Sequence, residues 1–180
     1  MRVIAGSARG IGLVAPRGDR TRPITDRVKE TLFGILGDRV PDARVLDLYA
    51  GSGAIGIEAL SRGAASADFV ERDRTALTAL ERNLEATRLG ADARVHAVDV
   101  DRFLATVEDR AWDLVVLDPP YEARAIVAPL RALARHLAPG ATVVVKHFWR
   151  TEVPEVEGLV AGRQRRFGET MLTFLEGPIP

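Results

Sequence analysis

Two short stretches of this chain hold residues whose types and spacing could do chemistry. The first runs from Asp47 to Gly53 and has the sequence Asp-Leu-Tyr-Ala-Gly-Ser-Gly. The second is Asp-Pro-Pro-Tyr at residues 118–121. A glycine turn brings backbone N–H groups close to a bound cofactor, whereas consecutive prolines remove N–H donors and leave mainly acceptors. Together the two stretches predict a cofactor cradle beside a clamp for a planar amine.

The glycine turn continues into the pattern G-x-G-x-x-G from Gly51 to Gly56, and Glu71 follows Gly51 by twenty residues. That pattern suits a nicotinamide dinucleotide as well as S-adenosylmethionine, since both have a ribose for the acid to hold. Asp47 separates the two readings. A carboxylate there would repel a pyrophosphate, but it suits a cofactor that carries an ammonium and a sulfonium. We therefore expect S-adenosylmethionine, and a nicotinamide oxidoreductase is the least favoured alternative.

Further cofactor contacts are expected from residues around the turn and beyond it. Ala50 and Ser52 belong to the turn itself, and Glu71 is placed to accept hydrogen bonds from both ribose hydroxyls. Asp99 could accept from the adenine amino group, while the amide of Val100 serves a ring nitrogen. The alternative for Asp99 is a capping role at the start of the next helix.

The Asp-Pro-Pro-Tyr turn predicts how an amine could be made reactive. The lone pair of an exocyclic amine is delocalised into its ring, which makes the amine a poor nucleophile. Two acceptors, the Asp118 carboxylate and the Pro119 carbonyl, would hold its two hydrogens and favour the geometry that frees the lone pair. Tyr121 would stack on the base. These three residues are the expected catalytic group, and a rigid turn with a capping aspartate is the structural alternative.

Alternating strand and helix patterns predict the elements that position these residues. Near-continuous apolar runs separated by helices are typical of a parallel sheet covered on both faces, the doubly wound α/β class. Thr25 is expected to cap a helix that Gly37 ends, and Asp73 to begin another that Gly90 ends. The expected parallel strands are residues 45–49, 67–71, 95–98, 114–118 and 142–145.

Both ends of the chain depart from this alternation. Residues 159–167 and 170–175 predict a terminal antiparallel hairpin joined at Gly168. At the other end, residues 2–5 and 11–14 predict a glycine-rich hairpin that stands as an appendage. We expect a β-hairpin extension over residues 1–22 and one catalytic domain over residues 23–180.

Composition and charge limit the classes of function. The chain has no cysteine and its three histidines are scattered, so no metal site is expected. No apolar run approaches the roughly 18 residues that span a bilayer, which predicts a soluble cytoplasmic protein without membrane contact. The net charge is zero, yet residues 1–40 hold eight Lys and Arg against four acids. This asymmetry favours a polyanion near the N-terminal end, with a solvated arginine-rich surface as the alternative.

At this point the chain resembles the bacterial ribosomal RNA small-subunit methyltransferase D family, which methylates a guanine N2 of 16S rRNA. The resemblance extends nearly from end to end, and its specific part is the N-terminal element that begins Arg-Pro-Ile-Thr-Asp-Arg. Its motifs are residues 22–33, 47–53, 58–64 and 118–121. It implies a class I methyltransferase fold with a seven-stranded, mostly parallel sheet and an N-terminal hairpin. The implied partner is 16S rRNA within a small subunit or an assembly particle, and we expect a monomer.

The resemblance also implies substrate-side residues. Thr25 and Arg27 would border the active site, unless they only cap a helix and face solvent. Phosphate contacts are expected from two groups of arginines, with ordinary surface solvation as the alternative for each. Those arginines are Arg9, Arg17, Arg20, Arg163, Arg165 and Arg166. The chain departs from the family pattern at Ile24, at Gly34 and at Lys146-His147, where an acid is more usual.

Two other readings remain open. Asp-Pro-Pro-aromatic turns also serve enzymes that methylate DNA adenine or cytosine, or a protein glutamine. A protein that keeps the fold without catalysis could instead act as an RNA-binding assembly factor.

Overall fold

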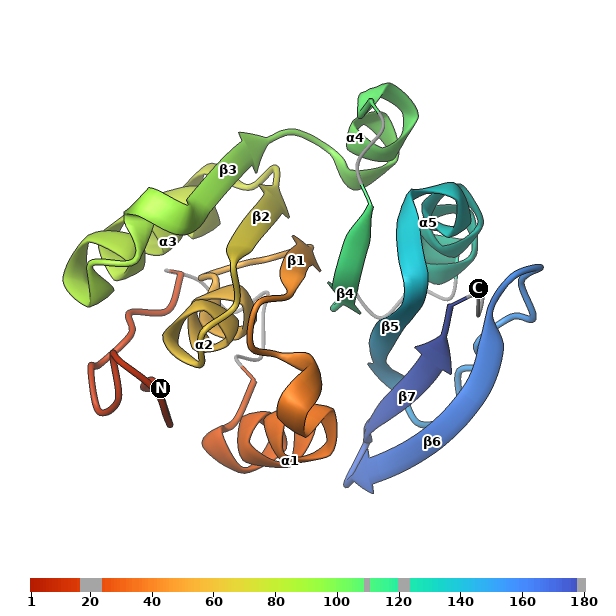
Figure 1. The fold of residues 1–180 in the computed structure, drawn as a ribbon, viewed down its shortest axis with the longest axis horizontal. Helices are drawn as coiled ribbons and strands as arrows, with labels where there is room; N and C mark the ends of the chain where they lie inside the picture. The colour runs from red at the N-terminus through yellow and green to blue at the C-terminus, as the bar shows by residue number, and fades with distance from the viewer. Residues whose placement is uncertain (17–23, 109–110, 120–123, 178–180) are drawn as a thin grey trace.

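A computed structural model describes residues 1–16, 24–108, 111–119 and 124–177. It contains a seven-stranded sheet in the order β3-β2-β1-β4-β5-β7-β6 (Figure 1). Strands β1 to β5 are parallel, and β7 pairs antiparallel with both β5 and β6. The strands are β1 (Arg44–Leu48), β2 (Ser66–Glu71), β3 (Ala93–Ala97), β4 (Trp112–Leu117), β5 (Leu137–Phe148), β6 (Val160–Phe167) and β7 (Thr170–Glu176).

Helices cover both faces of this sheet. Figure 1 shows α1, α2 and α3 on one side and α4 and α5 on the other. The helices are α1 (Asp26–Leu36), α2 (Ala54–Ser61), α3 (Arg74–Thr87), α4 (Val100–Thr106) and α5 (Arg124–Leu133), with 3-10 turns at Gly37–Arg39, Gly90–Asp92 and Ala134–His136. Strand residues alternate between two apolar clusters, so that Val45 packs towards α1 to α3 and Leu46 towards α4 and α5. Within the described ranges, no helix has the length and apolar character needed to cross a membrane.

Local signals placed several of these boundaries correctly. The Thr25 hydroxyl accepts a hydrogen bond from the Val28 N–H, and Gly37 ends α1 with a positive φ of 50°. Asp73 caps α3 through the N–H groups of Thr75 and Ala76.

The largest differences from the predicted boundaries are at the end of α3 and at both ends of β5. α3 ends at Thr87 rather than at Gly90, because Arg88 already adopts the left-handed conformation and its N–H bonds back into the last turn. β5 begins at Leu137 rather than at residue 142, since Leu137 pairs with Trp112 across an irregularity in the register. It also continues to Phe148, which places Lys146 and His147 inside the strand.

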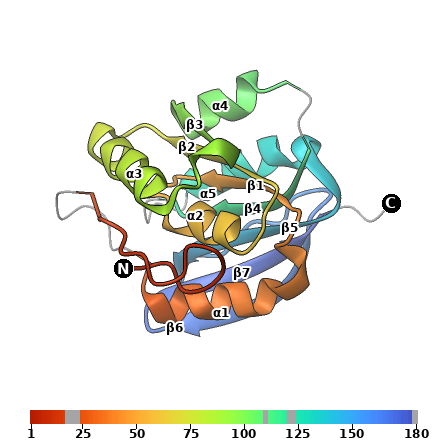
Figure 2. The same ribbon diagram turned by 60° about the vertical axis from the view of Figure 1, so that its left-hand side comes forward.

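The N-terminal extension is more closely integrated than the appendage we expected. Its hairpin is present in outline, as one antiparallel bridge between Arg2 and Gly12 rather than two paired strands. Val3, Ala8 and Leu13 are buried in the same apolar cluster as α1 and α2. Figure 2 shows this segment lying against α1 and α2. The division between residues 22 and 23 stays a prediction, because residues 17–23 lie outside the described ranges.

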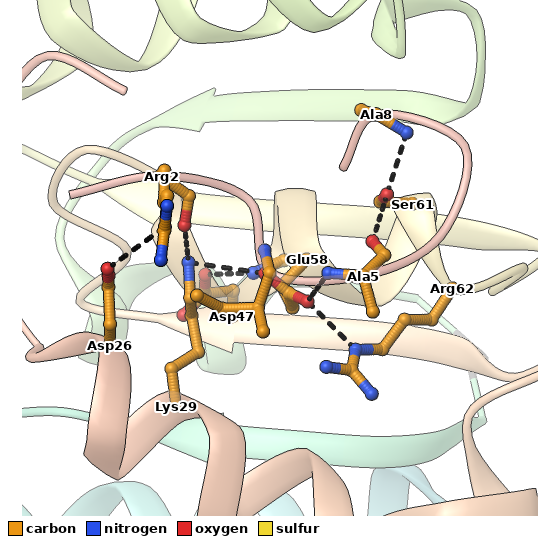
Figure 3. Close-up of polar contacts among 11 residues, drawn as sticks. Arg2, Ala5, Ala8, Asp26, Lys29, Asp47, Glu58, Ser61 and Arg62 are labelled. Carbon is orange, nitrogen blue, oxygen red and sulfur yellow. Dashed lines mark hydrogen bonds and ion pairs between the residues drawn. The ribbon is translucent and has the colours of Figure 1, made fainter. Parts of the chain in front are cut away.

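A buried ion pair anchors this segment to α2 (Figure 3). Lys29 and Glu58 have fully buried side chains, and the Lys29 Nζ lies 3.2 Å from Glu58 Oε2. Glu58 also accepts from the backbone N–H groups of Ile4 at 2.8 Å and Ala5 at 3.0 Å, and from Arg62 Nε at 2.8 Å. Buried charges need such partners, since desolvation is otherwise unfavourable. The helix that follows the glycine turn is thereby fixed to the start of the chain.

Candidate active site

The carboxyl ends of the parallel strands bring four ionisable side chains to one face of the sheet. Strand alternation directs Asp47, Glu71, Asp118 and Lys146 towards the side covered by α1 to α3. Leu48 lies level with Leu117, which in turn lies level with Val145. The next residues after Leu117 and Val145 are Asp118 and Lys146, which are therefore neighbours. Parallel sheets of this class bind their ligands at this edge.

Gly51 and Gly53 of the turn between β1 and α2 both have a positive φ, and at Gly53 a side chain would also clash with its neighbours. Gly51 has a φ of +57°, and a Cβ there would meet only the Tyr49 carbonyl oxygen at 4.0 Å. Its side is therefore open. Gly53 has a φ of +76°, and a Cβ there would lie 2.2 Å from the Cδ1 of Leu80. Only glycine allows α2 and α3 to pack this closely behind an open turn. Ala50 and Ser52 of the same turn are buried.

Asp47 lies beneath this turn with almost no exposure to solvent. Its side chain is 1% exposed, and its Oδ2 accepts a hydrogen bond of 2.9 Å from the Gly56 N–H. Burial raises the pKa of Asp47 to about 8, and the charges of Asp118 and Glu71 add to that rise against the opposing Gly56 bond. A buried carboxylate among other acids is stabilised by a nearby cation. The site therefore fits the cationic S-adenosylmethionine that the sequence predicts.

Glu71, at the end of β2, holds the glycine turn in place. Its Oε2 accepts from the Gly51 N–H at 2.9 Å, and its Oε1 accepts from the N–H groups of Arg72 and Asp73 at 2.8 Å each. A carboxylate has roughly four acceptor positions, so these three bonds leave one on Oε2 for a ribose hydroxyl. The predicted contact with both ribose hydroxyls would need a fifth acceptor position. One of the three backbone N–H groups would then have to share a Glu71 lone pair with a hydroxyl.

Asp99 takes the capping role that the sequence left as an alternative. Its Oδ1 accepts from the Asp101 N–H at 3.0 Å, which caps α4, and its Oδ2 lies 2.9 Å from an Arg72 guanidinium nitrogen. Val100 is the first residue of α4 and is buried. Their contact with adenine stays a prediction.

Asp118 makes a close ion pair at the proposed amine clamp. The Lys146 Nζ donates to Asp118 Oδ1 at 2.6 Å and to Oδ2 at 2.8 Å. The two side chains are only 26% and 11% exposed, Asp118 and Lys146 respectively. Burial raises the pKa of Asp118, although the Lys146 charge and hydrogen bonds oppose this rise. Pro119 is buried beside it, whereas Tyr121 lies outside the described residues.

The expected substrate-side residues are exposed where the structure describes them. Thr25 caps α1 and Arg27 faces solvent, and their place at the border of the active site stays a prediction. Arg9 is exposed in the N-terminal segment, while Arg17 and Arg20 lie outside the described residues. The remaining three candidates are exposed along β6: Arg163, Arg165 and Arg166. The Arg166 guanidinium lies 3.9 Å from the ring centre of Trp149, just beyond β5.

Sequence analysis missed two polar residues that tie the site together. Asn83 of α3 donates to the Ser52 carbonyl at 2.9 Å and to the Val14 carbonyl at 3.0 Å, linking the glycine turn to the N-terminal segment. Its signal was a polar residue between Leu80 and Leu84 on the buried stripe of α3. Lys146 was noted only as a departure from the family pattern. Its signal was its position directly after an apolar strand run, matching that of Asp118.

Comparisons with known proteins agree with this geometry. The family model described as "Conserved hypothetical protein 95" matches residues 1–176. The YlbH protein of Bacillus subtilis, described as a candidate rRNA methyltransferase, is 39% identical over 175 residues, which are 94% of this chain and 95% of that protein. Ribosomal RNA small subunit methyltransferase D of Escherichia coli is 44% identical over 121 residues, which are 67% of this chain and 60% of that protein.

A solved structure gives the same result for the fold. The Escherichia coli protein yhhF, described as a candidate methyltransferase, covers 100% of this chain and 99% of its own with a TM-score of 0.89 and 33% identity. The predicted class I fold and its cofactor, S-adenosylmethionine, are thus confirmed. With the family model matched from residue 1 to residue 176, the chain belongs to the ribosomal RNA small-subunit methyltransferase D family.

Proposed function

We propose that this chain, an S-adenosylmethionine-dependent rRNA methyltransferase by family, methylates the exocyclic N2 amine of a guanine in 16S rRNA. The observation that carries the proposal is the shared position of Asp118 and Asp47. Both lie at the carboxyl edge of the sheet, on the face that also carries the glycine turn. A group that accepts amine hydrogens and a group that attracts a cationic cofactor thus lie on adjacent strands.

Each acidic residue has a separate task in this proposal. Asp47 attracts the positive charge of the cofactor, and Glu71 holds the glycine turn and offers an acceptor to a ribose hydroxyl. S-adenosylmethionine supplies the methyl group when bound. The Asp118 carboxylate and the Pro119 carbonyl accept hydrogen bonds from the two amine hydrogens and so align the lone pair with the methyl group. The amine loses one of these protons as or after its bond to the methyl carbon forms, and the methyl donor leaves as a neutral thioether, so no strong base is needed to begin. Tyr121 stacks on the guanine, which must leave its own stack to enter.

We further propose that the exposed arginines hold the RNA around that guanine. Arg9 and the three arginines of β6 are exposed and available for phosphate contacts, and Arg17 and Arg20 are proposed for the same role. Thr25 and Arg27 are proposed to border the guanine. The substrate is 16S rRNA in a small subunit or assembly particle, and the protein acts as a monomer in the cytoplasm.

Transfer of labelled methyl groups tests this proposal. The purified protein and labelled S-adenosylmethionine are incubated separately with small ribosomal subunits, naked 16S rRNA, DNA and a protein fraction. We expect label in 16S rRNA, recovered after digestion as N2-methylguanosine. Label in DNA or protein alone would overturn the proposed substrate, and no label in any fraction would favour an assembly factor that does not catalyse.

A further inference from the structure

The Lys146 ammonium binds the Asp118 carboxylate, which is the group that the proposed function assigns to the substrate amine. The ammonium lies within hydrogen-bond distance of both carboxylate oxygens, at 2.6 Å and 2.8 Å. Such a contact either blocks the amine, serves only the fold, or prepares the carboxylate for its task. The surroundings of the pair distinguish these three roles.

The fold itself fixes the pair in place. Leu117 and Val145 are level in the parallel pairing of β4 and β5, so Asp118 and Lys146 occupy adjacent positions on one face of the sheet. On its other side, Lys146 is level with Leu172 of β7. Its side chain is 11% exposed. A lysine held this way has lost most of its conformational freedom before any substrate arrives.

The charges around Asp118 show why a cation is needed there. On the β1 side the charge of Asp118 acts on the buried Asp47, which brings no positive charge. Among the described residues, the cation that acts on Asp118 is Lys146. Burial favours the neutral carboxylic acid at Asp118. A neutral Asp118 would carry a hydroxyl donor where the amine needs an acceptor.

The two Lys146 bonds also leave acceptor positions on Asp118 for the amine. A carboxylate has roughly four acceptor positions, two on each oxygen. One ammonium that bridges both oxygens takes the inner position of each and leaves the two outer positions open. The substrate amine can therefore bond to Asp118 while Lys146 stays in place, which argues against a blocking role.

We propose that Lys146 is a positioning residue for the methyl transfer, because its ammonium keeps the Asp118 carboxylate charged and turned with an outer acceptor position towards the substrate amine. This inference rests on the proposed function, since Asp118 must be the amine acceptor. Lys146 acts through Asp118 and makes no contact with the reacting atoms.

Three variants of Lys146 and one matched control test the role. Lys146→Arg keeps the charge, Lys146→Gln keeps a hydrogen bond without charge, and Lys146→Met removes both. The control is Arg44→Met, which breaks the Arg44–Asp113 pair at the opposite edge of the sheet, between β1 and β4. All four are compared with the wild type in melting temperature, S-adenosylmethionine affinity and steady-state kinetics from pH 5.5 to pH 9.5.

For the Met and Gln variants we expect a fall in kcat that depends on pH. Their acid limb shifts to higher pH by about a unit, which lowers kcat by up to about tenfold at pH values below the limb, and the activity returns towards that of the wild type at high pH. KM and cofactor affinity change little. The Arg variant retains most of the activity, and the control keeps the wild-type pH profile. An unchanged profile in the Met and Gln variants, an equal loss at every pH, or a gain of activity would overturn the proposal.

A titration that needs no substrate separates this inference from the proposed function. Carbon-13 NMR of the labelled aspartate carboxyl groups, with Asp118→Asn to assign the signal, follows Asp118 in each folded variant. We expect its titration to move to higher pH in Lys146→Gln and to stay near the wild type in Lys146→Arg. If the wild type methylates a different amine, the kinetic comparison is made on that substrate. An Asp118 signal that does not move in Lys146→Gln contradicts the role of Lys146 whatever the substrate is.

Discussion

The two ends of β4 carry aspartates with opposite electrostatics. Asp113, near the start of the strand, is bound by the Arg44 side chain at 2.9 Å and 3.1 Å, and both side chains are well exposed. The Arg44 hydrogen bond lowers the pKa of Asp113. Asp118, just past the end, is also paired with a cation from a neighbouring strand, yet burial raises its pKa. Pairing alone therefore does not distinguish the two aspartates, whereas burial does.

The opposite pKa shifts of Asp113 and Asp118 suggest different roles for the two edges of the sheet. An exposed pair contributes little to stability, typically up to about 1 kcal/mol, and it leaves its carboxylate charged at all ordinary pH values. In a half-buried carboxyl group with a raised pKa, the charged form is less stable than it is in water. Groups of this kind are common at functional sites. On this basis we propose that the carboxyl edge carries the activity and that the amino edge only holds β1 against β4.

The largest effect is expected from removing Asp118 at the carboxyl edge of the sheet. Asp118→Ala removes one acceptor of the amine clamp, and we expect kcat to fall by about a hundredfold to a thousandfold. Cofactor affinity should change much less, as measured by calorimetry. Asp113→Ala is the control from the same strand and should keep kcat within about twofold. Equal losses from both variants would contradict the division between the two edges.

The fully buried Lys29–Glu58 pair allows the same comparison to be made for stability. Lys29→Met leaves the buried Glu58 carboxylate without its ammonium partner, which should lower the free energy of unfolding by about 3–5 kcal/mol. Denaturant unfolding followed by circular dichroism measures this change. A loss below that of Arg44→Met would show that the buried Lys29–Glu58 pair stabilises the fold no more than an exposed pair does.

The pH dependence of cofactor binding sharpens the account of Asp47. With a pKa of about 8, this carboxyl group is mostly protonated at neutral pH in the absence of a cation. Binding of a cation must then release a proton, so affinity should rise with pH and level off above about pH 8. Calorimetry in buffers of different ionisation enthalpy measures that release.

Asp47→Asn is the matched variant, since the amide oxygen can still accept from Gly56. We expect its affinity for S-adenosylmethionine to be about tenfold to a hundredfold lower and nearly independent of pH. An unaltered pH dependence in this variant would assign the proton to another group.

The smallest effect is expected at the exposed Arg44–Asp113 pair. Arg44→Met should lower the free energy of unfolding by less than about 1 kcal/mol at neutral pH. The folded-state pKa of Asp113 lies below its usual value, so this pair stabilises the fold above that value and loses its contribution as the pH falls through the lowered one. The difference between variant and wild type should therefore become smaller in acid. Urea unfolding at pH 7 and pH 3 provides the test.

Local patterns were sufficient to predict the positions of Asp47, Glu71 and Asp118. Each lies at or near the carboxyl end of an apolar strand run, and the carboxyl ends of parallel strands meet at one edge. Helix caps at Thr25 and Asp73 were equally local, because a capping side chain bonds to N–H groups two or three residues away.

Features that depend on contacts between distant elements could not be predicted in the same way. The Lys146–Asp118 pair requires the register of β4 against β5, and the three hydrogen bonds of the Asn83 side chain join residues 31 and 69 positions away. The early start of β5 likewise depends on Trp112 pairing with Leu137. Local propensity contains no information about these distances.

The state of 16S rRNA in cells tests the central claim most directly. A strain that lacks the gene is complemented with the wild type, with Asp118→Ala or with an empty vector, and its 16S rRNA is mapped by mass spectrometry of nuclease fragments. The account predicts one guanine that carries a methyl group on N2 with the wild type and lacks it with the other two. Full methylation of that guanine with Asp118→Ala, or no difference between the wild type and the empty vector, would contradict it.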